Sequence, residues 1–147
     1  MTATEIDQAL SDAAAQVLET MFFTSLAEDG EPTPITGPCV CTRVSFHGGA
    51  SGRLGVRVPV DTAREIAANF LGVEGAELTD ARVNDVICEL TNMACGLVLG
   101  HLDGLFELSH PEVGPRETGC PRGEPAACRT LALEGGAIEL WLEWEDQ

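Results

Sequence analysis

The organising element of the chain is the stretch Thr79-Asp80-Ala81-Arg82-Val83-Asn84-Asp85-Val86-Ile87-Cys88-Glu89-Leu90-Thr91-Asn92-Met93-Ala94-Cys95-Gly96-Leu97-Val98-Leu99-Gly100-His101-Leu102. Its apolar residues recur at the helical period, which predicts one amphipathic helix with a continuous apolar stripe facing a core. The stripe consists of Val83, Val86, Ile87, Leu90, Met93, Ala94, Leu97 and Val98. Four residues share the opposite side, at the i, i+4, i+7, i+11 spacing that stacks side chains along one line. They are Asp85, Glu89, Asn92 and Gly96.

This polar line is not what helix stability alone would select. Asp85 and Glu89 are like charges four residues apart, an arrangement that costs roughly a few tenths of a kcal/mol in an isolated helix. Gly96 inside a helix costs about 0.5 to 1 kcal/mol relative to Ala, but its missing side chain leaves room for another backbone. The line is therefore a candidate contact surface, and the alternative is a solvated helix face without a function.

Composition and charge bound the class of protein. At 147 residues the chain is long enough for one domain with a sizeable core. Its 24 acidic residues against 8 basic ones give a formal net charge of -16, so we expect neither nucleic acid nor a membrane as a partner. Every basic residue is an arginine, and Lys and Tyr are absent. This excludes Schiff-base and P-loop lysines and tyrosine nucleophiles.

We expect no targeting signal at the N-terminus. It reads Met1-Thr2-Ala3-Thr4-Glu5, without a basic region followed by an apolar one, and no span approaches about 18 uninterrupted apolar residues. We therefore expect a cytoplasmic protein whose six cysteines are thiols.

Periodicity outside the central stretch predicts the remaining elements. Helices are expected at residues 4–27, after a capping box of Thr2 and Glu5, and at residues 63–71, before Gly72. Strands are expected at 40–46 and 54–58 around a turn, at 105–109, and as a second hairpin over 130–144; the Gly/Pro-rich stretch 114–127 is expected to be a loop. Hairpins with helices before and between them indicate an α+β two-layer fold, an antiparallel sheet with long helices packed on one face.

Cysteine and histidine spacings do not support metal or thiol chemistry. None of the six cysteines is followed by an arginine six residues later, as a cysteine phosphatase requires. Cys88 and Cys95 are seven residues apart on the helix, about 10 Å by helical rise, which is too far for one metal ion without further ligands. No pair has C-x-x-C spacing, and the three histidines form no H-x-x-x-H pair. We therefore expect no metal site.

The central helix resembles a known signature. The pattern Asp85-x-x-x-Glu89-x-x-Asn92, continued by Met93-Ala94-Cys95-Gly96, is similar to the signature helix of the CheC, FliY and CheX phosphatases of bacterial chemotaxis. The resemblance extends from about Cys39 to Val113 and includes the strand and helix that precede the signature. CheC and FliY carry two signature helices and this chain carries one, which favours the CheX type. The resemblance implies that residues 1–147 form a single CheX-like domain.

The resemblance also implies an activity, the hydrolysis of the aspartyl phosphate on a CheY-like receiver domain in chemotaxis or a related two-component pathway. Asn92 would orient the attacking water, and Glu89 would pair with a lysine of the receiver beside the phosphoryl group. Asp85 and Gly96 would bind the partner, Gly96 by giving clearance and Asp85 at the rim unless it only stabilises the helix start. The protein would need no cofactor of its own, because Mg²⁺ would come with the receiver. The resemblance also implies a homodimer, because CheX-like domains form dimers.

Two other functions remain open at this point. One is a non-catalytic adaptor that uses the same helix surface to hold a receiver or a receptor-associated protein. The other is a cysteine-based metal or redox module, which would bind zinc or depend on a thiol. The joint presence of Glu89 and Asn92 favours the phosphatase over both.

Overall fold

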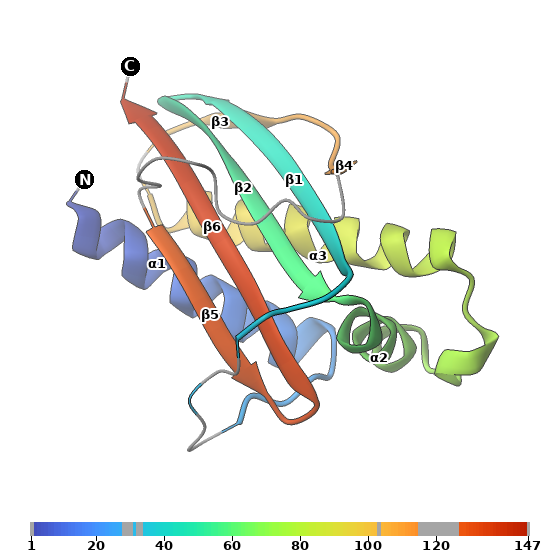
Figure 1. Cartoon of the computed structure of the whole chain (residues 1–147). Coiled ribbons are helices and arrows are strands. Elements are labelled where there is room, and N and C mark those ends of the chain that lie inside the picture. The colour runs from blue at the N-terminus through green and yellow to red at the C-terminus, as the bar shows by residue number, and fades with distance from the viewer. Residues whose placement is uncertain (1, 28–30, 32–33, 103, 115–126, 147) are drawn as a thin grey trace.

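The computed structural model describes residues 2–27, 31, 34–102, 104–114 and 127–146, with only the backbone of residue 146. Its helical elements are α1 (Ala3–Gln16), the π-helical turn η1 (Val17–Met21), α2 (Val60–Leu71), the 3₁₀ turn η2 (Gly75–Glu77) and α3 (Asp80–Gly100). Its strands are β1 (Cys39–Gly48), β2 (Ala50–Pro59), β3 (Phe106–Leu108), β4 (Glu112–Val113), β5 (Ala127–Leu133) and β6 (Gly136–Asp146) (Figure 1).

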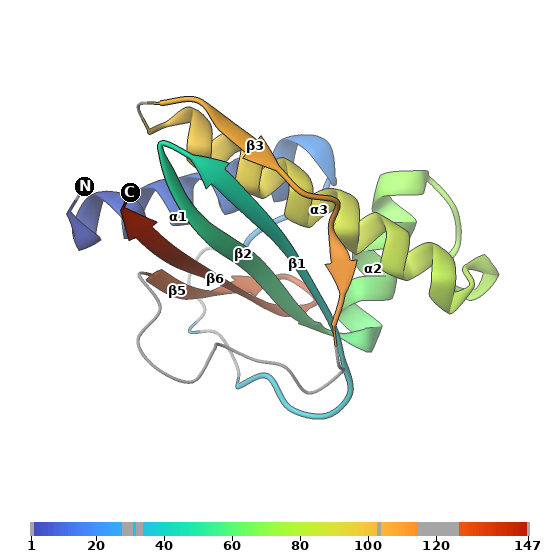
Figure 2. The same cartoon turned by 90° about the horizontal axis from the view of Figure 1, so that it is seen from above.

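The strands of the described chain form one antiparallel sheet in the order β3-β1-β2-β6-β5, and β4 also pairs with β1. Figure 2 shows α1 and α3 lying side by side across one face of this sheet, with α2 at one end. The two-layer α+β architecture expected from the sequence is confirmed, with antiparallel strands and long helices on one face.

The core lies between the helices and one face of the sheet. Alternate strand residues point towards the helices, and the largest of them are fully buried: Val44, Leu54, Ile138, Leu140 and Leu142. The apolar stripe of α3 packs on them together with the buried side of α1. Because burial of apolar area is the main stabilising term, this contact determines which side of each helix faces inward.

The first helix is shorter than its periodicity predicts. It ends at Met21 rather than near residue 27. Phe22 stays buried and stacks on Phe70 of α2 at 4.5 Å between ring centroids, and Phe23 adopts a positive φ of 52°. The chain then runs beside β5, where the amide of Ala27 donates to the carbonyl of Ala132. Pairing with the open edge of β5 thus replaces the last helical turn.

Most local predictions hold. Thr2 and Glu5 form the capping box of α1, Gly72 ends α2 in the left-handed conformation at φ 68°, and both hairpins form. The strand β4 was not predicted, because two residues show no alternation. The predicted loop 114–127 lies, except for its first and last residues, outside the described chain.

The sheet face that points away from the helices carries charge pairs and a buried indole. Arg53 binds both carboxylate oxygens of Glu143 at 3.0 Å, and Arg57 lies 3.5 Å from Glu139. Trp141 is only 3% exposed, and its ring lies on Gly55, where an added Cβ would come within 2.1 Å of ring atoms. The cysteines Cys39, Cys88 and Cys95 are free. Cys128 is disulfide-bonded, so the expectation of thiols throughout the chain is wrong at that residue.

Candidate functional site

The start of α3 is held by its cap and by α2. The hydroxyl of Thr79 accepts a hydrogen bond from the amide of Arg82 at 3.2 Å, as an N-cap does. Arg64 of α2 donates to the carbonyl of Leu78 at 2.7 Å and lies 2.9 Å from the carboxylate of Asp80 in the first turn. These bonds fix the position of the helix relative to α2.

The rotation of α3 about its axis is set by its buried side. Thr91 is fully buried, and its hydroxyl donates to the carbonyl of Ile87 at 2.8 Å and bonds the hydroxyl of Thr42 on β1. Thr91 was absent from the predicted apolar stripe, whereas the structure buries it among that stripe. Each residue along a helix is rotated by about 100° from the one before it. With Thr91 anchored against the sheet, Asn92 and Glu89, one and two positions away, therefore point away from the sheet.

All four residues of the predicted polar line lie on the outer side of α3. Asp85, Glu89 and Gly96 are exposed and Asn92 is half-buried. The side chains of Asp85, Glu89 and Asn92 make no hydrogen bond or ion pair within the described part of the protein. A Cβ added to Gly96 would meet no atom within 4 Å. The polar groups of this outer face therefore have no partner in the described part of the protein and are available to another molecule.

The electrostatics of this face exclude a reactive thiol on it. Cys88 lies between the two carboxylates, and its pKa is raised first by burial and then by the charges of Asp85 and Glu89. Burial raises the pKa of Cys95, one turn before Leu99, to about 12. Both groups stay protonated near neutral pH, and a thiol is a poor nucleophile and metal ligand. Among the described residues, no three His, Cys, Asp or Glu side chains are grouped as metal ligands.

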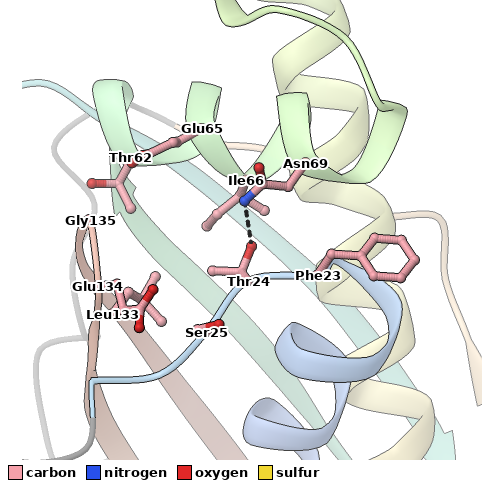
Figure 3. Close-up of a pocket in the computed structure, with 10 residues that line it drawn as sticks. All are labelled: Phe23, Thr24, Ser25, Thr62, Glu65, Ile66, Asn69, Leu133, Glu134 and Gly135. Atoms are coloured by element: carbon pink, nitrogen blue, oxygen red, sulfur yellow. Dashed lines mark hydrogen bonds between the residues drawn. The ribbon is translucent and has the colours of Figure 1, made fainter.

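The outer face of α3 is an exposed helix surface and not the wall of a pocket. A pocket of about 130 Å³ lies elsewhere, between α2, the segment after η1 and the turn from β5 to β6 (Figure 3). Thr24, Glu65, Asn69 and Glu134 contribute its polar lining, with Asn69 donating to Thr24 at 3.4 Å. No residue of the polar line contributes to this pocket. The α3 face can thus enter a hollow of a partner, but it cannot enclose a small substrate.

By length and composition alone, α3 is also a candidate membrane span, although half of its most apolar window is buried within the fold. Core helices of folded domains give the same signal.

Arg82 is a residue of α3 that the sequence reasoning did not single out. It is exposed and lies one turn before Asp85. Its position three residues before Asp85 places it beside the polar line on the helix surface, and this spacing could have identified it from the sequence.

Comparison with known proteins identifies the family of the chain. Residues 40–119 match the family model described as chemotaxis phosphatase CheX. A complex of CheX with CheY, BeF3 and Mg²⁺ from Borrelia burgdorferi is 20% identical, with 95% of this chain and 97% of that chain covered and a TM-score of 0.75. CheX from Desulfovibrio desulfuricans is 21% identical, with 96% and 99% covered and a TM-score of 0.73. CheX from Vibrio vulnificus is 21% identical, with 99% of both chains covered and a TM-score of 0.74.

No curated protein matches the sequence significantly. The family match nevertheless covers more than half of the 147 residues and includes all of α3 with its outer polar line. The resemblance read from Asp85, Glu89 and Asn92 is confirmed, and the protein belongs to the CheX family of chemotaxis phosphatases.

Proposed function

We propose that this protein hydrolyses the aspartyl phosphate of a CheY-like receiver domain. The observation that carries the proposal is the pair Glu89 and Asn92, one helical turn apart on the outer face of α3 and without a partner among the described residues. A solved CheX complex contains CheY with BeF3 and Mg²⁺, which supports a receiver as the partner class. An exposed helix face suits a substrate that is itself a folded domain with a hollow active site.

The chemistry asks little of the protein beyond positioning. The carboxamide of Asn92 can accept a hydrogen bond through its oxygen and donate one through its nitrogen, so it can hold a water molecule in line with the phosphorus. The water oxygen attacks phosphorus and the bond from phosphorus to the aspartyl oxygen breaks. The products are inorganic phosphate and the free aspartate of the receiver, and the water protons leave with the phosphate or pass to solvent. Mg²⁺ belongs to the receiver and offsets charge on the phosphoryl oxygens.

Glu89 serves to dock and align the two proteins. Its carboxylate is exposed, makes no ion pair with the part of the chain that the structure describes, and precedes Asn92 by one turn. It can therefore pair with a lysine beside the phosphoryl group of the receiver. Asp85 would contact the rim, and Gly96 would let the receiver backbone approach. A hundredfold acceleration requires only about 2.7 kcal/mol of transition-state stabilisation, which alignment of one water can supply. The family resemblance further implies a cytoplasmic homodimer.

The proposal is tested with a panel of phosphorylated receivers from the same organism. Wild type should accelerate the loss of phosphate from at least one of them, and Glu89→Gln should reduce that acceleration by about tenfold or more. Glu65→Gln is the matched control, because Glu65 is an exposed glutamate on α2 that lines the pocket of Figure 3. Binding of a receiver without acceleration would instead identify a non-catalytic adaptor.

A further inference from the structure

An open hollow lies where α3 begins. Its volume is about 400 Å³, and it is lined by Leu71, Val73, Glu77, Leu78, Thr79 and Arg82; we call it the Arg82 hollow. Val73 is 41% exposed, and Leu71 and Leu78 are half-buried. Apolar side chains therefore form its wall, and one cation and one anion stand at its rim.

Arg82 differs from the other described arginines. Each of the other five lies within 3.6 Å of a carboxylate: Arg43 of Glu112, Arg53 of Glu143, Arg57 of Glu139, Arg64 of Asp80 and Arg129 of Asp7. Within the described chain, the guanidinium of Arg82 has no such partner, although the protein has a net charge of -16.

Two acidic side chains lie close to Arg82 in sequence without forming this pair. Asp85 follows it by three residues, in the order that is less favourable on a helix, where the acid should precede the base. Glu77 lines the same hollow and likewise makes no ion pair with any residue that the structure describes. The guanidinium, with its planar fork of donors, is left for a carboxylate from outside.

The Arg82 hollow is continuous with the proposed catalytic face. Arg82, Asp85 and Glu89 follow at i, i+3 and i+7 on one side of α3, so about 10 Å of helix separates Arg82 from Glu89. A typical interface buries about 800 Å² on each partner, which corresponds to a disc of about 16 Å radius. A domain centred on Glu89 and Asn92 would therefore also cover the hollow.

We infer that the Arg82 hollow is a second docking site for the receiver, where it takes an apolar side chain and pairs Arg82 with a neighbouring carboxylate. This inference rests on the proposed function and adds the contact that selects the receiver. Arginine and aromatic residues are enriched among the residues that dominate binding energy at protein interfaces. Because the hollow lies about 15 Å of helix away from Asn92, it acts on binding and not on the hydrolytic step.

The test separates binding from chemistry. Arg82→Glu should raise the KM for the phosphorylated receiver by about tenfold and leave kcat within about twofold of wild type. Glu77→Arg is the matched charge reversal at the same rim. Because it removes a negative charge beside the proposed carboxylate, it should lower the KM or leave it unchanged. A rim charge pair is also screened by salt, so the KM of wild type should rise with ionic strength more steeply than that of Arg82→Glu.

The outcomes distinguish this inference from the proposed function. If wild type hydrolyses the phosphate and Arg82→Glu has an unchanged KM, the docking site is wrong and the phosphatase stands. If Glu77→Arg raises the KM as much as Arg82→Glu, no carboxylate docks there and the inference is also overturned. If wild type binds a receiver without hydrolysis and Arg82→Glu weakens that binding by about tenfold, docking stands and the phosphatase falls. Absence of both binding and hydrolysis across the panel overturns both.

Discussion

Thr42 of β1 and Thr91 of α3 join their hydroxyls in the buried layer between sheet and helix. Since the hydroxyl of Thr91 donates to the carbonyl of Ile87, the hydroxyl of Thr42 is the donor between the two threonines. This contact fixes the side of α3 that faces the sheet, and with it the outward direction of Glu89 and Asn92.

Replacing Thr91 alone should therefore cost more than replacing both threonines. Thr91→Val leaves the buried hydroxyl of Thr42 without its acceptor and should lower the free energy of unfolding by about 1 to 3 kcal/mol. The double variant Thr42→Val/Thr91→Val removes both hydroxyls at nearly constant shape and should be more stable than Thr91→Val. Urea unfolding of wild type and the two variants measures this, and a double variant less stable than Thr91→Val would contradict the hydrogen bond.

At Gly96, stability and activity should move in opposite directions. Because a Cβ there would meet nothing within 4 Å, Gly96→Ala should raise the free energy of unfolding by about 0.5 to 1 kcal/mol. The longer side chain of Gly96→Gln would occupy the space proposed for the receiver and should raise the KM for the phosphorylated receiver by about tenfold or more. Thermal unfolding and dephosphorylation kinetics measure the two effects. Full activity of Gly96→Gln would show that no partner approaches this position.

The same glycine-to-alanine change should have the opposite effect at Gly55. A Cβ at Gly55 would lie 2.1 Å from the ring of Trp141, which is 3% exposed and packed on the sheet. Gly55→Ala should lower the free energy of unfolding by about 1 to 3 kcal/mol through overpacking. Denaturant unfolding of Gly55→Ala and Gly96→Ala under the same conditions provides the comparison. An unchanged free energy of unfolding in Gly55→Ala would mean that the indole does not lie on this residue.

Cys95 should make the protein less stable at alkaline pH. Burial raises the pKa of this thiol from 9.0 to about 12 in the folded state, so between these values the unfolded chain loses a proton that the folded chain keeps. Stability is therefore lost as the pH rises through this window, by about 1.4 kcal/mol at pH 10 for this group. Urea unfolding of wild type and Cys95→Ala between pH 8 and pH 10 isolates the contribution. Equal pH dependence of the two proteins would contradict it.

Local periodicity was sufficient to predict the outer line of α3. The apolar stripe from Val83 to Val98 decides which side is buried, so the exposure of Asp85, Glu89 and Gly96 followed from spacing alone. Turn chemistry was almost as local: the second hairpin was expected around Gly135-Gly136, and its two turn residues are Glu134 and Gly135, one position earlier.

Features that depend on contacts distant in sequence could not be predicted. The end of the first helix depends on β5, which pairs with Leu26 and Ala27 only in the folded chain. Thr91 is a polar residue whose burial requires Thr42, 49 positions earlier. The free guanidinium of Arg82 became visible only when the other described arginines had been paired in space.

The most direct test of the central claim is the single-turnover loss of phosphate from a phosphorylated receiver at saturating concentrations of Asn92→Ala. The account predicts a fall to the receiver's own rate, with binding to the receiver retained. Asn84→Ala, a matched change of a half-buried asparagine on another side of α3, should hydrolyse like wild type. Hydrolysis by Asn92→Ala at the wild-type rate would show that its carboxamide does not position the water.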